Sequence, residues 1–144
     1  MRSISVLFVL LVGCAPAADF DPSLLDLEWV GEFESGRSAR SDGVVTLSVA
    51  PDVDGNLVGT YTFETLDPFW EGAAAVYTVE GRLEGEELVL ESRVEEADAL
   101  PPRCSWCQGE LRLGLSPTGE EVLVGDWVSG GCQSTGSYEF SVWD

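Results

Sequence analysis

The sequence predicts an all-β fold, a single eight-stranded antiparallel up-and-down barrel that follows an N-terminal signal peptide. Three observations support this prediction. Apolar and polar residues alternate with period two in eight segments, the pattern of half-buried strands. Turn sequences separate these segments. The chain is 44% hydrophobic, which is enough for a core in one domain. Eight antiparallel strands with one apolar face each close into a barrel, which removes exposed edges. A β-sandwich is the alternative.

The N-terminal residues have the features of a secretory signal. Arg2 supplies a positive charge, and a short, nearly unbroken apolar run follows it. That run is too short to span a bilayer, which needs about 20 residues. The next four residues, Leu11-Val12-Gly13-Cys14, resemble the lipobox of bacterial lipoproteins.

The lipobox resemblance implies that residues 1–13 are removed as a lipoprotein signal peptide and that Cys14 carries the lipid. In that family the cysteine receives a diacylglyceryl thioether, and its new amino terminus is acylated. The next residue is Ala15 rather than Asp, which in enteric bacteria implies delivery to the outer membrane. We therefore expect an exported protein, lipid-anchored in the bacterial cell envelope. An ordinary signal peptide, cut near Ala15 or Ala17, is the alternative.

The chain is strongly acidic. It contains 26 Asp and Glu residues, seven Lys and Arg residues and no His, and its net charge is −19. Such a surface repels nucleic acid and lacks a polybasic patch for anionic lipid. We expect no nucleic-acid partner, and membrane contact through the lipid alone. Residues 14–26 are expected to be the lipidated cysteine and a tether, and residues 27–144 the barrel domain.

The eight predicted strands follow one another along the chain, and no helix is predicted after the signal. Each strand has one face that is expected to point inward. In chain order, these faces are Leu27, Trp29, Gly31 and Phe33; Val45, Leu47 and Val49; Leu57, Gly59, Tyr61 and Phe63; Tyr77, Val79, Gly81 and Leu83; Leu88, Leu90 and Ser92; Leu111, Leu113 and Leu115; Leu123, Gly125 and Trp127; and Tyr138, Phe140 and Val142.

The connections between these strands are of two kinds. Tight turns with Gly or Pro are expected at residues 54–55, 84–86 and 116–119. Longer links are expected over about residues 34–43, 64–75, 94–109 and 128–136. Because alternate connections of a meander fall at the same end, we expect a closed end and an open mouth.

The segment Gly55-Asn56-Leu57-Val58-Gly59-Thr60-Tyr61 resembles the second hairpin of avidin and streptavidin, eight-stranded barrels that bind biotin. In that family the motif ends in a tyrosine that contacts the ligand, and Tyr61 holds its place here. The first strand, Trp29 to Phe33, has a Gly-x-aromatic pattern that is also seen in avidins and lipocalins. It lacks the Asn and Ser that follow in biotin binders. The resemblance therefore implies the fold and not the ligand.

Three cysteines are candidates for a disulfide: Cys104, Cys107 and Cys132. An exported compartment favours disulfides. The Cys104-x-x-Cys107 pair is not at a helix start, where redox pairs lie, and a zinc site would have only Cys132 as a further thiolate. With a turn at residues 116–119, facing positions sum to about 235, which places Cys104 near residue 131. We expect Cys132 to pair with Cys104 or Cys107. A Cys104–Cys107 pair, a metal site and a redox role are the alternatives.

Six aromatic residues are candidate ligand contacts: Tyr61, Phe69, Trp70, Tyr77, Trp106 and Tyr138. Those on the mouth links either contact a ligand or partner, or fold over and plug the barrel. The tyrosines are expected to face inward, where their hydroxyls need partners. An eight-stranded barrel is just wide enough to fill itself or to hold one small ligand.

The sequence carries no catalytic signature. Without His, the usual triads and general bases are absent, and we expect no enzymatic activity, no metal and no cofactor. The acidic loop at residues 52–56 lacks the bidentate Glu of a calcium loop and is interpreted as a turn. Our main hypothesis is an envelope lipoprotein that binds a small apolar ligand at the mouth. The alternative is a filled barrel that meets another envelope protein.

Overall fold

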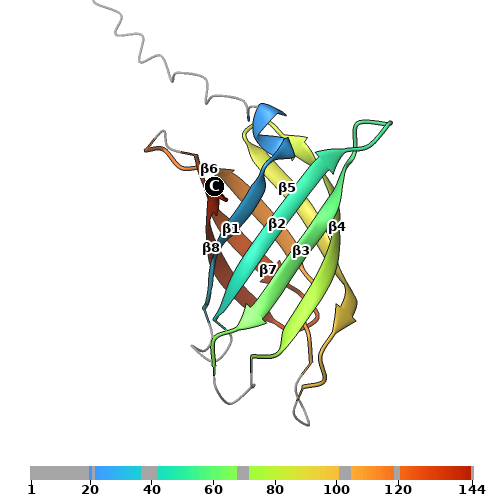
Figure 1. The fold of residues 1–144 in the computed structure, drawn as a ribbon, viewed down its shortest axis with the longest axis vertical. Helices are drawn as coiled ribbons and strands as arrows, with labels where there is room; N and C mark the ends of the chain where they lie inside the picture. Colours follow the sequence, from blue (N-terminus) through green and yellow to red (C-terminus); the bar gives the residue numbers. More distant parts are fainter. Residues whose placement is uncertain are drawn as a thin grey trace, which may run out of the picture.

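The computed structural model describes residues 20, 22–36, 42–67, 72–100, 105–118 and 121–143. These residues form a closed barrel of eight antiparallel strands in up-and-down order (Figure 1), which confirms the predicted fold. The strands are β1 (Glu28–Ser35), β2 (Gly43–Pro51), β3 (Leu57–Thr65), β4 (Ala74–Glu84), β5 (Glu87–Ala97), β6 (Glu110–Leu115), β7 (Val122–Ser129) and β8 (Ser134–Val142). No helix in the described part of the chain is long and apolar enough to cross a membrane.

Several strands run further toward the mouth than the alternation predicts. Strand β5 reaches Ala97, and only residues 130–133 separate β7 from β8, so the prediction of a long link at 128–136 is wrong. Inward positions near the mouth are partly filled by serines such as Ser92 and Ser129, which weaken the apolar pattern. The backbone hydrogen bonds continue there because they do not depend on the side chain.

The faces that were predicted to point inward form the core. Its most completely buried large side chains lie in the middle of the barrel: Leu47, Leu88, Leu90, Leu111, Leu113, Leu123 and Phe140. Most of these residues are aliphatic, and they fill the barrel below the mouth.

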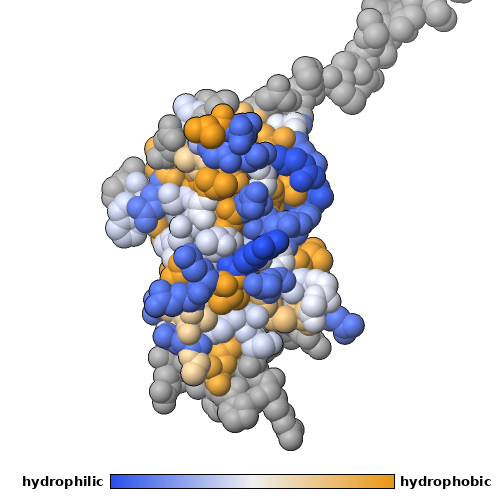
Figure 2. All heavy atoms as spheres, turned by 90° about the vertical axis from the view of Figure 1, so that its right-hand side faces the viewer, coloured by the Kyte–Doolittle hydropathy of each residue, from blue (hydrophilic) through white to orange (hydrophobic). Residues whose placement is uncertain are grey.

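Val89 is buried although it faces outward. It lies opposite Arg82 on β4 and opposite Arg112 on β6. Arg82 pairs with Glu84, and Arg112 pairs with Glu110, which holds both cations close to the wall. The aliphatic stems of long charged side chains can cover apolar surface in this way. Figure 2 shows the side where β4 and β5 lie, with hydrophilic residues between small groups of hydrophobic ones.

A short 3₁₀-helix, η1 (Pro22–Asp26), packs at the end of the barrel that carries the tight turns (Figure 1). Phe20 and Leu25 are buried in the core. The Phe20 N–H donates to the Gly85 carbonyl in the β4–β5 turn (3.4 Å), and the Trp29 indole N–H donates to the Leu24 carbonyl (3.2 Å). The sequence did not predict this helix. The end of the predicted tether therefore packs on the barrel, and the chain enters at the closed end.

The β2–β3 turn is organised by Asp52. Its carboxylate accepts the backbone N–H groups of Asp54 (2.9 Å) and Asn56 (3.0 Å). Gly55 adopts a positive φ of 83°, which glycine reaches without strain. These contacts are those of an Asx-type turn, as the sequence predicted.

Gly59 allows β3 to approach β2 closely. A Cβ atom at Gly59 would lie against the carbonyl oxygen of Ser48, well inside any nonbonded contact distance. Position 59 faces inward and requires glycine, because β2 and β3 lie too close together there for a Cβ atom.

We predict that Gly59→Ala lowers the free energy of unfolding by about 1–3 kcal/mol, because a strand must move to admit the methyl group. Gly114→Ala is the matched control, since a Cβ there would meet the Glu86 carbonyl oxygen at an ordinary 3.5 Å. Urea denaturation measures both variants. Equal losses of stability in the two would contradict the role of Gly59.

Candidate functional site

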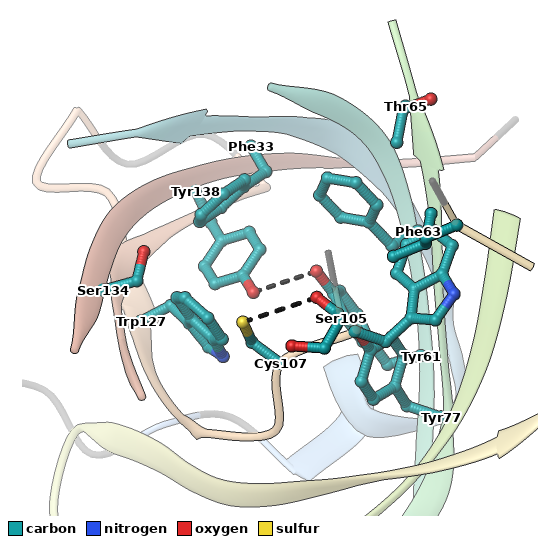
Figure 3. Close-up of a pocket in the computed structure, with 12 residues that line it drawn as sticks. Phe33, Tyr61, Phe63, Thr65, Tyr77, Ser105, Cys107, Trp127, Ser134 and Tyr138 are labelled. Atoms are coloured by element: carbon teal, nitrogen blue, oxygen red, sulfur yellow. Dashed lines mark hydrogen bonds between the residues drawn. The ribbon is translucent and has the colours of Figure 1, made fainter. Parts of the chain in front are cut away.

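A cavity of about 120 Å³ lies at the mouth of the barrel (Figure 3). Seven of the described residues that line it are aromatic: Phe33, Tyr61, Phe63, Tyr77, Trp106, Trp127 and Tyr138. The others are Thr65, Leu100, Ser105, Cys107 and Ser134. None of these described lining residues carries a charge.

The rings of the cavity hold one another in place. The Phe33 ring packs at 5.7 Å from Phe63, at 5.7 Å from Trp127 and at 5.0 Å from Tyr138, measured between centroids. Glycines make room for these rings, since a Cβ at Gly136 would collide with the Phe33 ring. Edge-to-face and tilted contacts of this kind favour a fixed arrangement.

The three tyrosines bring polar groups into this apolar space. The hydroxyls of Tyr61 and Tyr138 form a hydrogen bond of 2.9 Å, and the Tyr61 ring lies 5.2 Å from that of Tyr77. Burial raises the pKa of Tyr61 and of Tyr138 well above the usual value, and the neighbouring Tyr138 raises that of Tyr61 further. Burial also raises the pKa of Tyr77 to about 12. All three hydroxyls are therefore neutral at physiological pH.

The end of the β5–β6 connection, residues 105–109, is fixed inside the mouth. The Ser92 hydroxyl donates to the Gly109 carbonyl (2.8 Å), and the Ser129 hydroxyl donates to the Gln108 carbonyl (2.6 Å). The Trp106 indole N–H donates to the Asp98 carbonyl (2.7 Å). This segment thus carries Trp106 over the cavity, where its ring lies 6.2 Å from Phe63.

A disulfide between Cys107 and Cys132 ties this segment to the β7–β8 turn, with a Cα–Cα distance of 5.9 Å. The predicted disulfide that involves Cys132 is confirmed, and the alternative Cys104–Cys107 pair is wrong. The expected position of Cys104 near residue 131 rested on the wrong register. Facing positions of β6 and β7 sum to 238, because the first facing pair beyond the turn is Leu115 with Leu123. Cys104 lies outside the described residues.

The structure brings four of the six predicted contact residues together: Tyr61, Tyr77, Trp106 and Tyr138 all line the cavity. Phe69, Trp70 and the predicted lipidation residue Cys14 lie outside the described residues. Sequence reasoning did not single out Phe33, Phe63 and Trp127. Each is the last inward residue of a predicted strand that leads to a long link. Combining the alternation with the chain direction would have placed them at the mouth.

Comparisons of the chain with protein-family models, with curated proteins and with solved structures found no match. The interpretation of the site therefore rests on its own geometry.

We predict that the double variant Cys107→Ser/Cys132→Ser loses roughly 3 kcal/mol of stability, the entropy that the chain-entropy model assigns to a separation of 25 residues. Changing both cysteines leaves neither of the two free to form a new pair. Urea denaturation of the wild type with and without reductant gives the comparison. A stability that does not change in either experiment would contradict a structural role.

The tyrosines give a prediction for alkaline pH. The chain has three tyrosines, and all of them line the cavity. The folded protein should keep these hydroxyls protonated at pH 10.0, the ordinary pKa, whereas the unfolded chain loses the protons there. Stability is therefore unaffected below about pH 10 and falls as the pH rises from 10 toward 12. Tyrosinate absorbance and circular dichroism measure this together, and ionisation of any tyrosine near pH 10 in folded protein would count against it.

Proposed function

We propose that this protein is a noncatalytic lipoprotein of the bacterial cell envelope, anchored through Cys14, whose barrel binds a small, largely apolar ligand at its mouth. The observation that carries the proposal is the aromatic cavity. Ligand sites are typically concave and apolar, with a few placed polar groups. A cavity of about 150 Å³ in another protein binds benzene. The cavity of about 120 Å³ here therefore suits one ring or the end of a chain.

The chemistry of the lining supports a binding role rather than catalysis. The described lining residues include no carboxylate, and the chain has no His. The titratable hydroxyls of the cavity are tyrosines whose pKa is raised by burial, so they are poor proton acceptors near neutral pH.

If Cys14 carries the lipid, the anchor would lie on the side of the barrel away from the mouth. Phe20 is fixed at the closed end, and Cys14 precedes it by six residues in the sequence. Even a fully extended segment of that length spans only about 20 Å. The closed end would then stay near the membrane, while a nine-residue strand carries the mouth about 30 Å further along its length. A ligand would reach the cavity from the aqueous side.

A second candidate function is a platform for another envelope protein. It is favoured by the extent to which the interior is filled, since ligand pockets commonly have about 300–1,000 Å³ and this cavity has about 120 Å³. Crosslinking in cells from a photoreactive residue at position 105 distinguishes the two. A protein captured at that position would favour the platform.

The test of the main proposal is native mass spectrometry of the protein purified from its own host. We expect a chain that begins at an acylated Cys14 and carries a noncovalent small molecule. Ser134→Trp should expel this molecule because Ser134 lines the cavity. Thr135→Trp is the control, since the exposed Thr135 is the next residue on the strand and lies on the outer wall.

Each part of this proposal can fail separately. An unmodified Cys14 in the mature chain would contradict the anchor. A wild-type barrel without any bound molecule, or a molecule that Ser134→Trp retains, would contradict the ligand site.

A further inference from the structure

Two hydrogen-bond donors at the cavity, both on side chains that are largely buried, have no partner among the described residues. They are the hydroxyl of Tyr77 and the indole N–H of Trp127, on side chains that are 5% and 8% exposed. The Trp106 indole N–H donates to the Asp98 carbonyl. The hydroxyls of Tyr61 and Tyr138 share one hydrogen bond, which uses one of their two protons. Thr65 Oγ1 also has no partner among the described residues. The Tyr77 and Trp127 donors are available to a ligand.

The two donors come from different walls of the barrel. Tyr77 is on β4 and Trp127 is on β7, and Figure 3 shows them on different sides of the cavity. Both side chains lie among apolar rings, where a hydrogen bond is stronger than in water. Burial raises the pKa of Tyr77 to about 12, so its hydroxyl keeps the proton that it would donate. The indole N–H of Trp127 can only donate. Both groups therefore call for an acceptor on the ligand.

The charge of the protein decides which acceptors fit. The described lining residues include no Arg, and the net charge of the chain is −19. A carboxylate in the cavity would lose its hydration without gaining a counter-ion from the described lining residues, and the net charge of the chain would disfavour its approach. A neutral oxygen acceptor meets neither obstacle.

Building on the proposed function, we propose that the ligand is an uncharged ring compound whose carbonyl or ether oxygen accepts a hydrogen bond from the Tyr77 hydroxyl. The ring packs against the aromatic side chains of the mouth. The Trp127 N–H offers a second donor on the opposite side, for a ligand that carries a second acceptor. Selectivity for neutral acceptors over anions follows from the absence of a cation in the described lining.

The test compares two probes of the same shape, cyclohexanone and methylenecyclohexane, in which a CH₂ group replaces the oxygen. Each is titrated into the wild type and into Tyr77→Phe, which keeps the ring and removes the hydroxyl, and NMR shifts of the cavity residues report binding. We expect Tyr77→Phe to weaken cyclohexanone by roughly 2- to 10-fold, the contribution of one hydrogen bond, and to leave methylenecyclohexane unchanged. The anion cyclohexanecarboxylate should bind the wild type more weakly than cyclohexanone.

The outcomes separate this inference from the proposed function. If both probes bind and Tyr77→Phe changes their affinities equally, Tyr77 is not the donor and this inference fails, while the ligand site stands. Tighter binding of the carboxylate would also overturn it. If no probe binds the wild type, the ligand site and this inference fail together. If Tyr77→Phe does not fold, the wild type alone still gives a test, because equal affinity for cyclohexanone and methylenecyclohexane would overturn the inference.

Discussion

Pairing of β1 with β8 closes the sheet, and the rest of the structure depends on this closure. Once the barrel is closed, all inward side chains share one interior of fixed width. The size of the side chain at each inward position must therefore fit the space that its neighbours leave. Glycine is required where one strand presses on the next, as at Gly59. Branched aliphatic side chains fill the middle of the barrel. Planar rings at the mouth meet edge to face, and a fixed set of such rings leaves a gap that no side chain of the described residues fills.

The cavity owes its shape to backbone attachments as much as to rings. Residues 105–109 are held by the buried serines Ser92 and Ser129 and by the disulfide to Cys132. These attachments come from three different strands or turns, so the segment cannot shift without breaking several of them together. A site that is built before its ligand arrives loses less entropy on binding. Ser92 and Ser129 therefore support the cavity without being among the residues that line it.

The inward faces of the strands could be predicted because the burial of one face is a local property of each strand. Register and strand ends could not, since they depend on partners. The turn between β6 and β7 is longer than predicted, so facing positions sum to 238 rather than about 235. The sequence left Cys104 and Cys107 open as partners of Cys132, and the structure selects Cys107. Helix η1 has too few residues for a periodic signal, and it forms because Phe20 and Leu25 find a place in the closed end. The cavity itself arises from ring orientations that no local pattern records.

The distribution of charge bears on how the proposed anchor would present the mouth. The turns of the closed end carry acidic residues, among them Asp52, Asp54 and Glu86. An anionic lipid surface repels such an end over roughly 8 Å at physiological salt, the distance over which salt screens its potential. The proposed lipid tether would pull the same end toward the membrane. If attraction is confined to this tether and repulsion acts on the barrel, the closed end would stand off the surface. The mouth would then face the solution from which the proposed neutral ligand comes.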